Sequence, residues 1–429
     1  MASIGAIFTN KDIRNRILFT LFAFLVYRLG SAITVPDVNT ADLIAGLENN
    51  SLFAMLNLLG GGGLEQFSVF ALGVTPYITA SIIMQLLSMD VIPSLTELSK
   101  SGAQGRKKID KYTRYLAVVF AFVQSLSMVY GFSMTYTSLI VGGVTIVKLM
   151  YIATIFTAGS MFLLWIGDQI SMKGIGNGVS MVIMAGIVGR MPRQFTAAWE
   201  SLVAGNSVEN GKWLFAAYVI VYLLIIVFVT LINTAERRIP IQYTSSSIAL
   251  SKQSKSNYLP LKVNSASVIP VIFASSLMMA PLQIATFLGK TDFVNLVQDW
   301  LGLGTWYSLL IYVVLIIFFT FFYTKMQVDP EKAAENLGKS GAYIPSVRPG
   351  TETKEYINHV LTRLTVLGSI ALATIAVMPH LMPILWPDMP SGMALGGTGM
   401  IIVVGVAIET VRQVQGLITQ KAYKKYYQD

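Results

Sequence analysis

The sequence has no cysteine and only two histidines, His359 and His380, among its 429 residues. Without cysteine, disulfide bonds, cysteine-ligated iron–sulfur clusters and thiol catalysis are excluded, and two histidines are too few for a histidine-rich metal site. No HExxH pattern, serine–histidine pairing or intramembrane aspartate pair suggests a protease, and no GxxxxGK[ST] phosphate-binding loop is present. We therefore expect no enzyme, no cofactor and no metal.

Charge is scarce as well, at 12% of the residues, whereas 54% of the side chains are apolar. A soluble protein usually has about a quarter of its residues charged. The apolar residues fall in runs of roughly 20, which is long enough to cross the ~30 Å hydrocarbon layer of a bilayer as a helix. The composition predicts an all-α polytopic membrane protein. The first run lacks a small-residue cleavage site, so we expect no cleavable signal peptide.

Ten such runs predict ten transmembrane helices, at about 17–35, 74–90, 113–133, 149–167, 177–195, 213–232, 265–288, 305–324, 359–380 and 395–413. Because ten is even, both termini are expected on the same side. Lysine and arginine divide 25 to 5 between the two sides, with Arg28 inside the first run. The positive-inside rule then predicts cytoplasmic termini. Basic loops can serve only to orient helices, but 233–264 and 325–358 are longer than mere connectors need to be.

Two segments do not fit a simple span. Residues 51–67, "SLFAMLNLLGGGGLEQF", begin as an apolar helix that is too short to span and soon meet four glycines. Irregular backbone at membrane depth survives only inside protein or along a cavity, which favours a re-entrant element; an interfacial helix on the outer leaflet is the alternative. The fifth run is short, opened by glycines and closed by Arg190.

The same phrase occurs in both halves of the chain. "VTPYITAS" (74–81) and "VIPVIFAS" (268–275) both read Val-x-Pro-x-Ile-x-Ala-Ser, in the second helix of each five-helix half. An odd number of spans per half gives the halves opposite orientations, as in an inverted repeat, and proline-broken segments at matching places indicate a site at the interface of the repeats. Ordinary helix packing by proline and small residues is the alternative explanation.

If Ile78 and Ile272 face each other at mid-membrane, they bind no ion and catalyse nothing. Isoleucine is apolar and stiff at its first torsion, so several around an axis would form a dry constriction that excludes water and ions. Such a constriction selects no particular chemistry. It would therefore suit a pore for a long, chemically varied substrate.

Two other functions remain open at this point. A secondary transporter of a small apolar or anionic solute could be built on an inverted repeat, but it would need a coupling-ion site, and buried charge is nearly absent from the spans. An insertase or scaffold that never conducts would leave the re-entrant segment and the apolar constriction without a role. No energy-coupling motif is present, so a driving force would come from a partner.

Several phrases resemble the SecY family, the large subunit of the bacterial protein-translocation channel, over nearly the whole chain. They are "FALGVTPYITASIIMQLL" (70–87), "KIDKYTRY" (108–115), "KGIGNGVSMVIMAGIV" (173–188), "ERRIPIQY" (236–243), "YLPLKVN" (258–264), "VIPVIFASS" (268–276), "IPSVRPG" (344–350) and "GGTGMIIVV" (396–404). None of these is a generic membrane pattern.

The resemblance implies a channel that passes unfolded polypeptides across the bacterial plasma membrane and releases membrane helices sideways into the bilayer. Its two inverted halves would be 1–195 and 196–429, around a central pore. By motif position the pore ring would be Val74, Ile78, Ile183, Ile272 and Ile402. The plug would be Ser51, Leu52, Phe53, Ala54, Met55, Leu56, Asn57, Leu58, Leu59, Gly60, Gly61, Gly62, Gly63 and Leu64.

The resemblance also implies a lateral gate, between helices two and three on one side and seven and eight on the other, with Thr79, Gln85 and Ser276 as its polar candidates. The two long cytoplasmic loops would dock the ribosome and the SecA motor ATPase through Arg237, Arg238 and Arg348. Basic loop tips attract acidic protein surfaces or RNA phosphates. Further implied partners are SecE-like and SecG-like small membrane subunits, signal peptides, nascent polypeptides and the lipid bilayer.

Two places depart from the family pattern. Residues 244–251, "TSSSIALS", are neutral where many members have a basic cluster, so this loop tip is expected to dock partners more weakly or differently. Ser346 stands where a glycine is usual, which is expected to stiffen the loop around Arg348.

Overall fold

The computed structural model describes residues 10–39, 66–89, 91–136, 139–204, 211–243, 258–288, 291–302, 305–385 and 397–426. Within these residues a helix occupies each of the ten predicted runs: α2 (Lys11–Ser31), α5 (Thr75–Leu87), α7 (Ala103–Thr135), α8 (Ile146–Lys173), α9 (Gly178–Trp199), α10 (Gly211–Thr234), α11 (Ile269–Leu288), α13 (Trp306–Gln327), α15 (Thr351–Leu385) and α16 (Gly397–Tyr426). Shorter helices are α6 (Pro93–Lys100), α12 (Thr291–Leu301) and α14 (Pro330–Lys339).

Six helical segments of the described residues are long and apolar enough to cross a membrane, namely Gln104–Met134, Ile146–Lys173, Gly211–Thr234, Trp306–Lys339, Thr351–Met378 and Gly399–Ile418. Thr75–Leu87 and Ile269–Met279 are apolar but shorter. The chain is therefore a mostly helical, polytopic membrane protein. That all ten helices span the bilayer stays a prediction.

Two features of the elements differ from expectation. The fifth helix extends past the predicted end at 195: α9 runs to Trp199 with Pro192 inside it and continues as a π-helical turn, Glu200–Ala204. The charged Arg190 and Arg193 close the apolar part of the run, but charge does not break a helix. The fold is also not purely helical. Strand β1 (Glu236–Pro240) pairs with β3 (Tyr258–Lys262), and β2 (Gln242–Tyr243) pairs with β4 (Ala342–Tyr343), both antiparallel.

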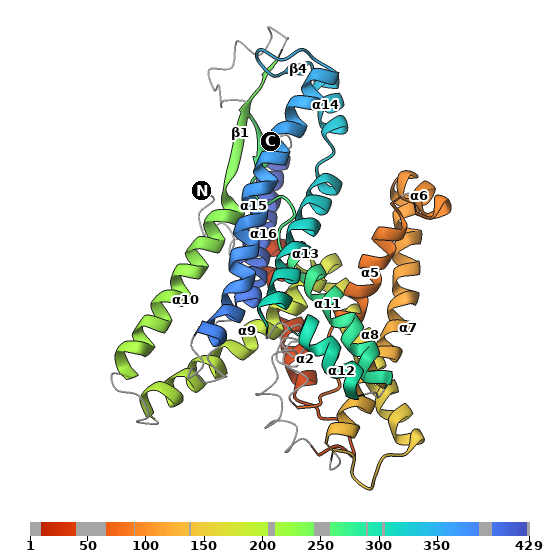
Figure 1. Cartoon of the computed structure of the whole chain (residues 1–429). Coiled ribbons are helices and arrows are strands. Elements are labelled where there is room, and N and C mark those ends of the chain that lie inside the picture. Colours follow the sequence, from red (N-terminus) through yellow and green to blue (C-terminus); the bar gives the residue numbers. More distant parts are fainter. Residues whose placement is uncertain are drawn as a thin grey trace.

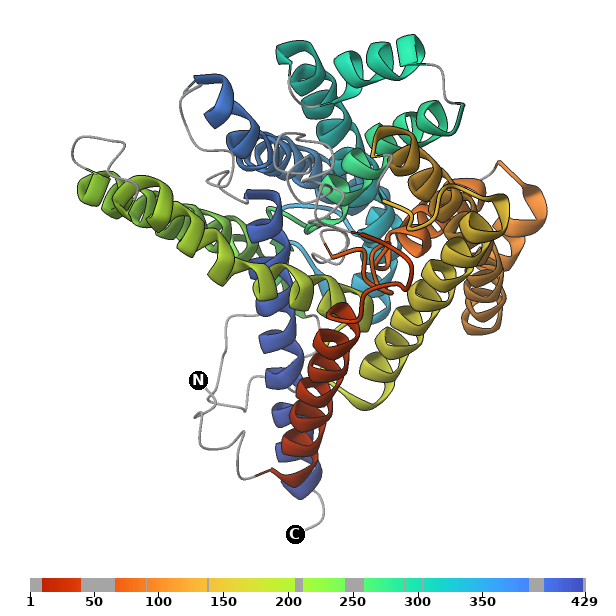
Figure 2. The ribbon, with the colours of Figure 1, turned by 90° about the horizontal axis from the view of Figure 1, so that it is seen from below.

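The helices divide into two groups around a shared apolar core. Helices α5, α7 and α8 lie on one side and α10 and α15 on the other, with α11 packed against both α7 and α13 (Figures 1 and 2). The largest apolar cluster draws residues from both groups and from α9 and α11. The strands and α14 form a separate extension at one end of the molecule (Figure 1).

Candidate functional site

Each copy of the duplicated phrase opens a helix. Pro76 is the second residue of α5 and Pro270 the second residue of α11. Proline is well tolerated there because the first N–H groups of a helix have no intrahelical acceptor. The Ile78 N–H donates to the Val74 carbonyl at 3.1 Å, and the Ile272 N–H donates to the Val268 carbonyl at 3.3 Å. The prolines therefore start their helices and do not break them, contrary to expectation.

The five positions expected to form the pore ring come together in one apolar cluster. Four of them, in or next to α5, α9 and α16, are buried members of the cluster, and Ile272 of α11 is partly buried against it: Val74, Ile78, Ile183, Ile402 and Ile272. All five side chains are apolar and β-branched, so each has few rotamers. Segments that are far apart in sequence thus contribute stiff, apolar side chains to the same cluster.

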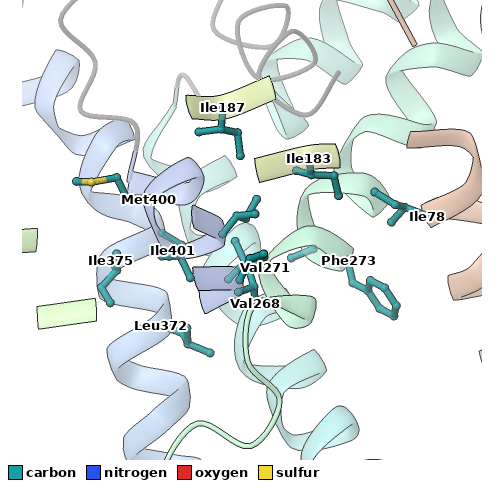
Figure 3. Packing of buried hydrophobic residues seen from close by; sticks show 14 of the residues in the cluster. Ile78, Ile183, Ile187, Val268, Val271, Phe273, Leu372, Ile375, Met400 and Ile401 are labelled. Carbon is teal, nitrogen blue, oxygen red and sulfur yellow. The ribbon is translucent and has the colours of Figure 1, made fainter. Parts of the chain in front are cut away.

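Figure 3 shows part of this cluster. Ile78 comes from α5, Ile183 and Ile187 from α9, Val271 from α11 and Ile401 from α16, and all five are buried in the same packed region. Residues from both predicted halves therefore contribute to it. We refer to this set of residues, together with the five ring positions, as the apolar waist.

A polar contact joins the two sides of the predicted gate. The hydroxyl of Tyr323, on α13, donates to the Oε1 atom of Gln85, on α5. The amide of Gln85 donates in turn to Ser81 at 3.2 Å within α5. The Tyr323 ring packs edge-on against Phe273 of α11, with centroids 4.9 Å apart. Helices α5, α11 and α13 are thus linked near the C-terminal ends of α5 and α13.

The other two gate candidates behave differently. The Thr79 hydroxyl donates to the Thr75 carbonyl of its own helix at 3.2 Å. Ser276 is buried on α11, and its hydroxyl oxygen has no hydrogen-bond partner within the described residues. Tyr323 was missed in the sequence, where its only signal is a hydroxyl within the aromatic run "FFTFFY" at the end of the eighth run.

The proposed plug, residues 51–64, lies outside the described residues, and so does the neutral tip 244–251. The segment that follows the plug is described from Gln66 onward. Phe67 is fully buried in a second apolar cluster, where it packs against the rings of Phe132 and Phe156. The Val35 N–H donates to the Phe67 carbonyl at 3.1 Å, which ties the end of this loop to the residues that follow α2.

The three arginines expected to dock partners are exposed. Arg237 and Arg238 lie on β1, and Arg348 precedes α15. Arg238 is positioned by a 2.9 Å ion pair with Glu236 and lies over the Tyr258 ring of the paired strand, 4.8 Å from its centroid. The Arg238 guanidinium donates a hydrogen bond to the Glu236 carboxylate, and this bond raises the pKa of Arg238.

The two long basic loops form one structural unit. Strands β2 and β4 pair across them. A separate apolar core lies between the β1–β3 pair, α14 and α15, and its buried members are Ile239, Leu261, Leu337, Ala342, Ile344 and Ile357. The loops are therefore not independent connectors. We call this unit the cytoplasmic module, after the side of the membrane on which the charge distribution predicts it.

A tight turn presents Arg348. The Val347 N–H donates to the Ile344 carbonyl at 3.1 Å, with Pro345 and Ser346 between them. Ser346 has a φ of +68°. Proline followed by a positive φ is the pattern of a type II turn, whose third position favours glycine. Position 346 thus requires a backbone conformation that costs serine energy and that glycine adopts more readily.

Among the described residues, no group of three or more histidine, aspartate or glutamate side chains is arranged to hold a metal ion.

Sequence comparison finds close relatives along almost the entire chain. A family description named SecY matches residues 68–411. The protein translocase subunit SecY of Staphylococcus epidermidis is 41% identical, with 98% of this chain and 97% of the relative aligned. The protein translocase subunit SecY 1 of Lactobacillus kefiranofaciens is 44% identical, with 97% of each chain aligned.

Solved structures share the fold. A structure of a protein-conducting channel has a TM-score of 0.68 at 19% identity and covers 94% of this chain and 92% of its own. Canine Sec61 in a ribosome–channel complex from the endoplasmic reticulum has a TM-score of 0.64 at 18% identity, again covering 94% and 92%. Together with the sequence relatives, these matches show that the chain belongs to the SecY family of protein translocase subunits.

Proposed function

We propose that this SecY-family chain conducts unfolded secretory polypeptides through the apolar waist and releases membrane helices sideways between α5 and α7 on one side and α11 and α13 on the other. The observation that carries the proposal is the meeting of Val74, Ile78, Ile183, Ile272 and Ile402 in one apolar cluster built from both halves. The names of the full-length relatives do not favour a small-solute transporter.

The waist would act as a seal. Apolar, stiff side chains around a narrow passage disfavour water and ions because a hydrated ion finds no polar partner there. The same side chains pack around a passing chain whatever its sequence. Residues 51–64 would serve as a plug on the outer side; the plug domain of a SecY protein with a solved structure stabilises the closed state and maintains a membrane seal.

Opening would begin at the Gln85–Tyr323 contact. A signal sequence that enters between α5 and α13 would separate these two side chains, and the widening would be transmitted to the waist because Ile78 lies on the same helix as Gln85. Residues 1–195 and 196–429 would move as two halves in this process. This arrangement requires ten spanning helices with cytoplasmic termini.

The cytoplasmic module would receive the partners that drive transport. Arg237, Arg238 and Arg348 expose positive charge on it, which suits an acidic motor protein such as SecA or ribosomal RNA. A related Sec61 channel is found in a ribosome complex. SecE-like and SecG-like subunits would complete the assembly in the plasma membrane.

Site-directed cross-linking tests the channel. The chain has no cysteine, so Ile78→Cys or Ile272→Cys each introduces a unique thiol. We expect either thiol to form a disulfide with a cysteine in the mature part of a stalled secretory polypeptide. Leu224→Cys, at an exposed position on α10, is the matched control and should not react. Translocation by a complex in which neither waist thiol ever reacts would refute the proposal.

A further inference from the structure

The short helix α12 has an apolar face that no other described part of the chain covers. Phe293, Leu296 and Trp300 are exposed, at intervals that place them on one side of the helix. An adjacent stripe, Val294, Val297 and Leu301, is packed inward against Ala285 of α11. The apolar arc of α12 is therefore half covered by protein and half open.

The rest of the helix is polar. Gln298 and Asp299 fall outside the apolar arc by the 3.6-residue period, and Asp299 is exposed. No lysine or arginine occurs in α12, whose sequence is "TDFVNLVQDWL". A helix with one broad apolar side, aromatic residues on it and a polar side opposite matches the apolar pattern of a helix that lies in a membrane interface, although α12 lacks the basic residues that are common on the polar side of such helices.

Ring contacts place α12 at the end of a membrane span. The Trp300 ring lies 5.3 Å from that of Tyr307, and Tyr307 lies 5.8 Å from Trp306, the first residue of α13. Trp306 is 72% exposed. Tryptophan and tyrosine concentrate at the depth where the bilayer meets water. The aromatic contacts therefore fix the open face of α12 near that depth.

The open face continues a surface that contacts lipid. Along α13 the exposed residues Trp306, Leu310, Val314 and Phe318 recur every four positions, which forms one stripe. This stripe lies within the candidate span Trp306–Lys339, so we expect acyl chains to cover it. Phe293, Leu296 and Trp300 extend the same surface beyond the end of the span.

We propose that α12 lies in the outer interface of the bilayer, with Phe293, Leu296 and Trp300 inserted at the boundary between headgroups and acyl chains. The open face of α12 contacts the apolar part of the leaflet and not an anionic headgroup, because α12 itself has no basic side chain. The polar side, with Asp299, faces water.

The position of α12 gives this contact a consequence for the gate. The helix connects α11 to α13, which form one side of the proposed gate, and packs against both of them. Insertion of α12 would hold the outer ends of these two helices at a fixed depth while the other side moves. This consequence rests on the proposed function, whereas the insertion itself does not.

Spin labels test the insertion in the full-length chain reconstituted into phosphatidylcholine vesicles. Leu296→Cys places a nitroxide on the open face, Asp299→Cys places one on the polar side, and Leu310→Cys on the α13 stripe serves as the lipid reference. We expect the Leu296 label to collide more often with oxygen than with a water-soluble nickel chelate, as the Leu310 label does. The Asp299 label should show the opposite order. Vesicles that contain phosphatidylglycerol should give the same result.

Two outcomes would overturn the insertion. A Leu296 label as open to the nickel chelate as the Asp299 label would place the face in water. A Leu296 label shielded from both reagents would show that protein, such as a second copy or another subunit, covers it. Neither spin-label measurement needs a translocating chain. A negative spin-label result would therefore not affect the cross-linking test of the apolar waist, and a negative cross-linking result would not affect the spin-label test.

Discussion

At the scale of single residues, the contact between Tyr323 and Gln85 is the polar link that we propose a signal sequence must break. A hydrogen bond of this kind contributes about 1 kcal/mol net, which corresponds to roughly a fivefold change in an equilibrium. The link is partly buried, and its two residues come from helices on opposite sides of the proposed gate. Its loss should therefore favour the open state without disturbing either helix.

Tyr323→Phe removes the hydroxyl and keeps the ring on Phe273. We expect export of a secretory protein with a weakened signal sequence to rise by about fivefold, because the closed state loses about 1 kcal/mol. Thr79→Val is the control, since the Thr79 hydroxyl donates within its own helix. Unchanged export in a normally accumulating Tyr323→Phe variant would contradict this role of the link.

Ser346 offers a second prediction at this scale. Its left-handed backbone costs a side-chain-bearing residue about 1–2 kcal/mol, part of which glycine gives back as greater freedom in the unfolded chain. We expect Ser346→Gly to stabilise the turn by about 0.5–1 kcal/mol and to slow limited proteolysis of 325–358 by about two- to fivefold. Ser346→Ala keeps the β-carbon and should give no such protection. Faster cleavage of the glycine variant would argue against strain at this turn.

At the scale of elements, the two basic loops are expected to lose their structure together. Ile239 of β1 is 2% exposed in the core of the cytoplasmic module. Truncating a buried isoleucine to alanine costs about 2–5 kcal/mol. Ile239→Ala should therefore speed proteolysis both near 236–262 and near 330–357, even though the substitution lies in only one of the loops. The helices that cross the membrane should remain protected.

Arg237→Ala is the matched control for this prediction, because it changes an exposed residue two positions away on the same strand. It should leave the proteolysis of both loops unchanged. If Ile239→Ala exposed only its own loop, the shared core and the β2–β4 pairing would not couple the two segments.

The elements also show what the sequence could and could not predict. Each apolar run became a helix because a membrane span must satisfy its backbone internally and keep its apolar side chains out of water. The β1–β3 pair could not be read in the same way, since its five-residue strands carry mixed polarity and their partners lie beyond a long loop. Local hydropathy also could not predict that α9 continues beyond residue 195 to Trp199.

The candidate site, too, could be predicted only in part from the sequence. The duplicated phrase drew attention to Ile78 and Ile272 because repetition is visible in one dimension. The partner of Gln85 was not visible, since Tyr323 is 238 positions away and the contact depends on how α13 lies beside α5. The pore ring itself remains a prediction that the cross-linking experiment addresses.

At the scale of the whole molecule, the distribution of charge makes the orientation testable. Lysine and arginine divide 25 to 5 between the two predicted sides. The positive-inside rule then places the cytoplasmic module inside the cell and the turn between α7 and α8 outside. The waist and the gate can serve export only in this orientation, because the proposed driving partners would bind at the cytoplasmic end.

Single cysteines in the cysteine-free chain can establish the sidedness directly. Val144→Cys lies in the exposed turn before α8, and Lys339→Cys lies at the exposed end of α14. A membrane-impermeant maleimide should label Val144→Cys in protoplasts, whose plasma membrane is intact and exposed on its outer face. It should label Lys339→Cys only in inverted vesicles. The reverse pattern would show that the chain has the opposite orientation in the membrane. The waist could then pass a polypeptide only in the opposite direction. Labelling of both positions from the same side would instead require an even number of spans between residues 144 and 339, in place of the predicted five.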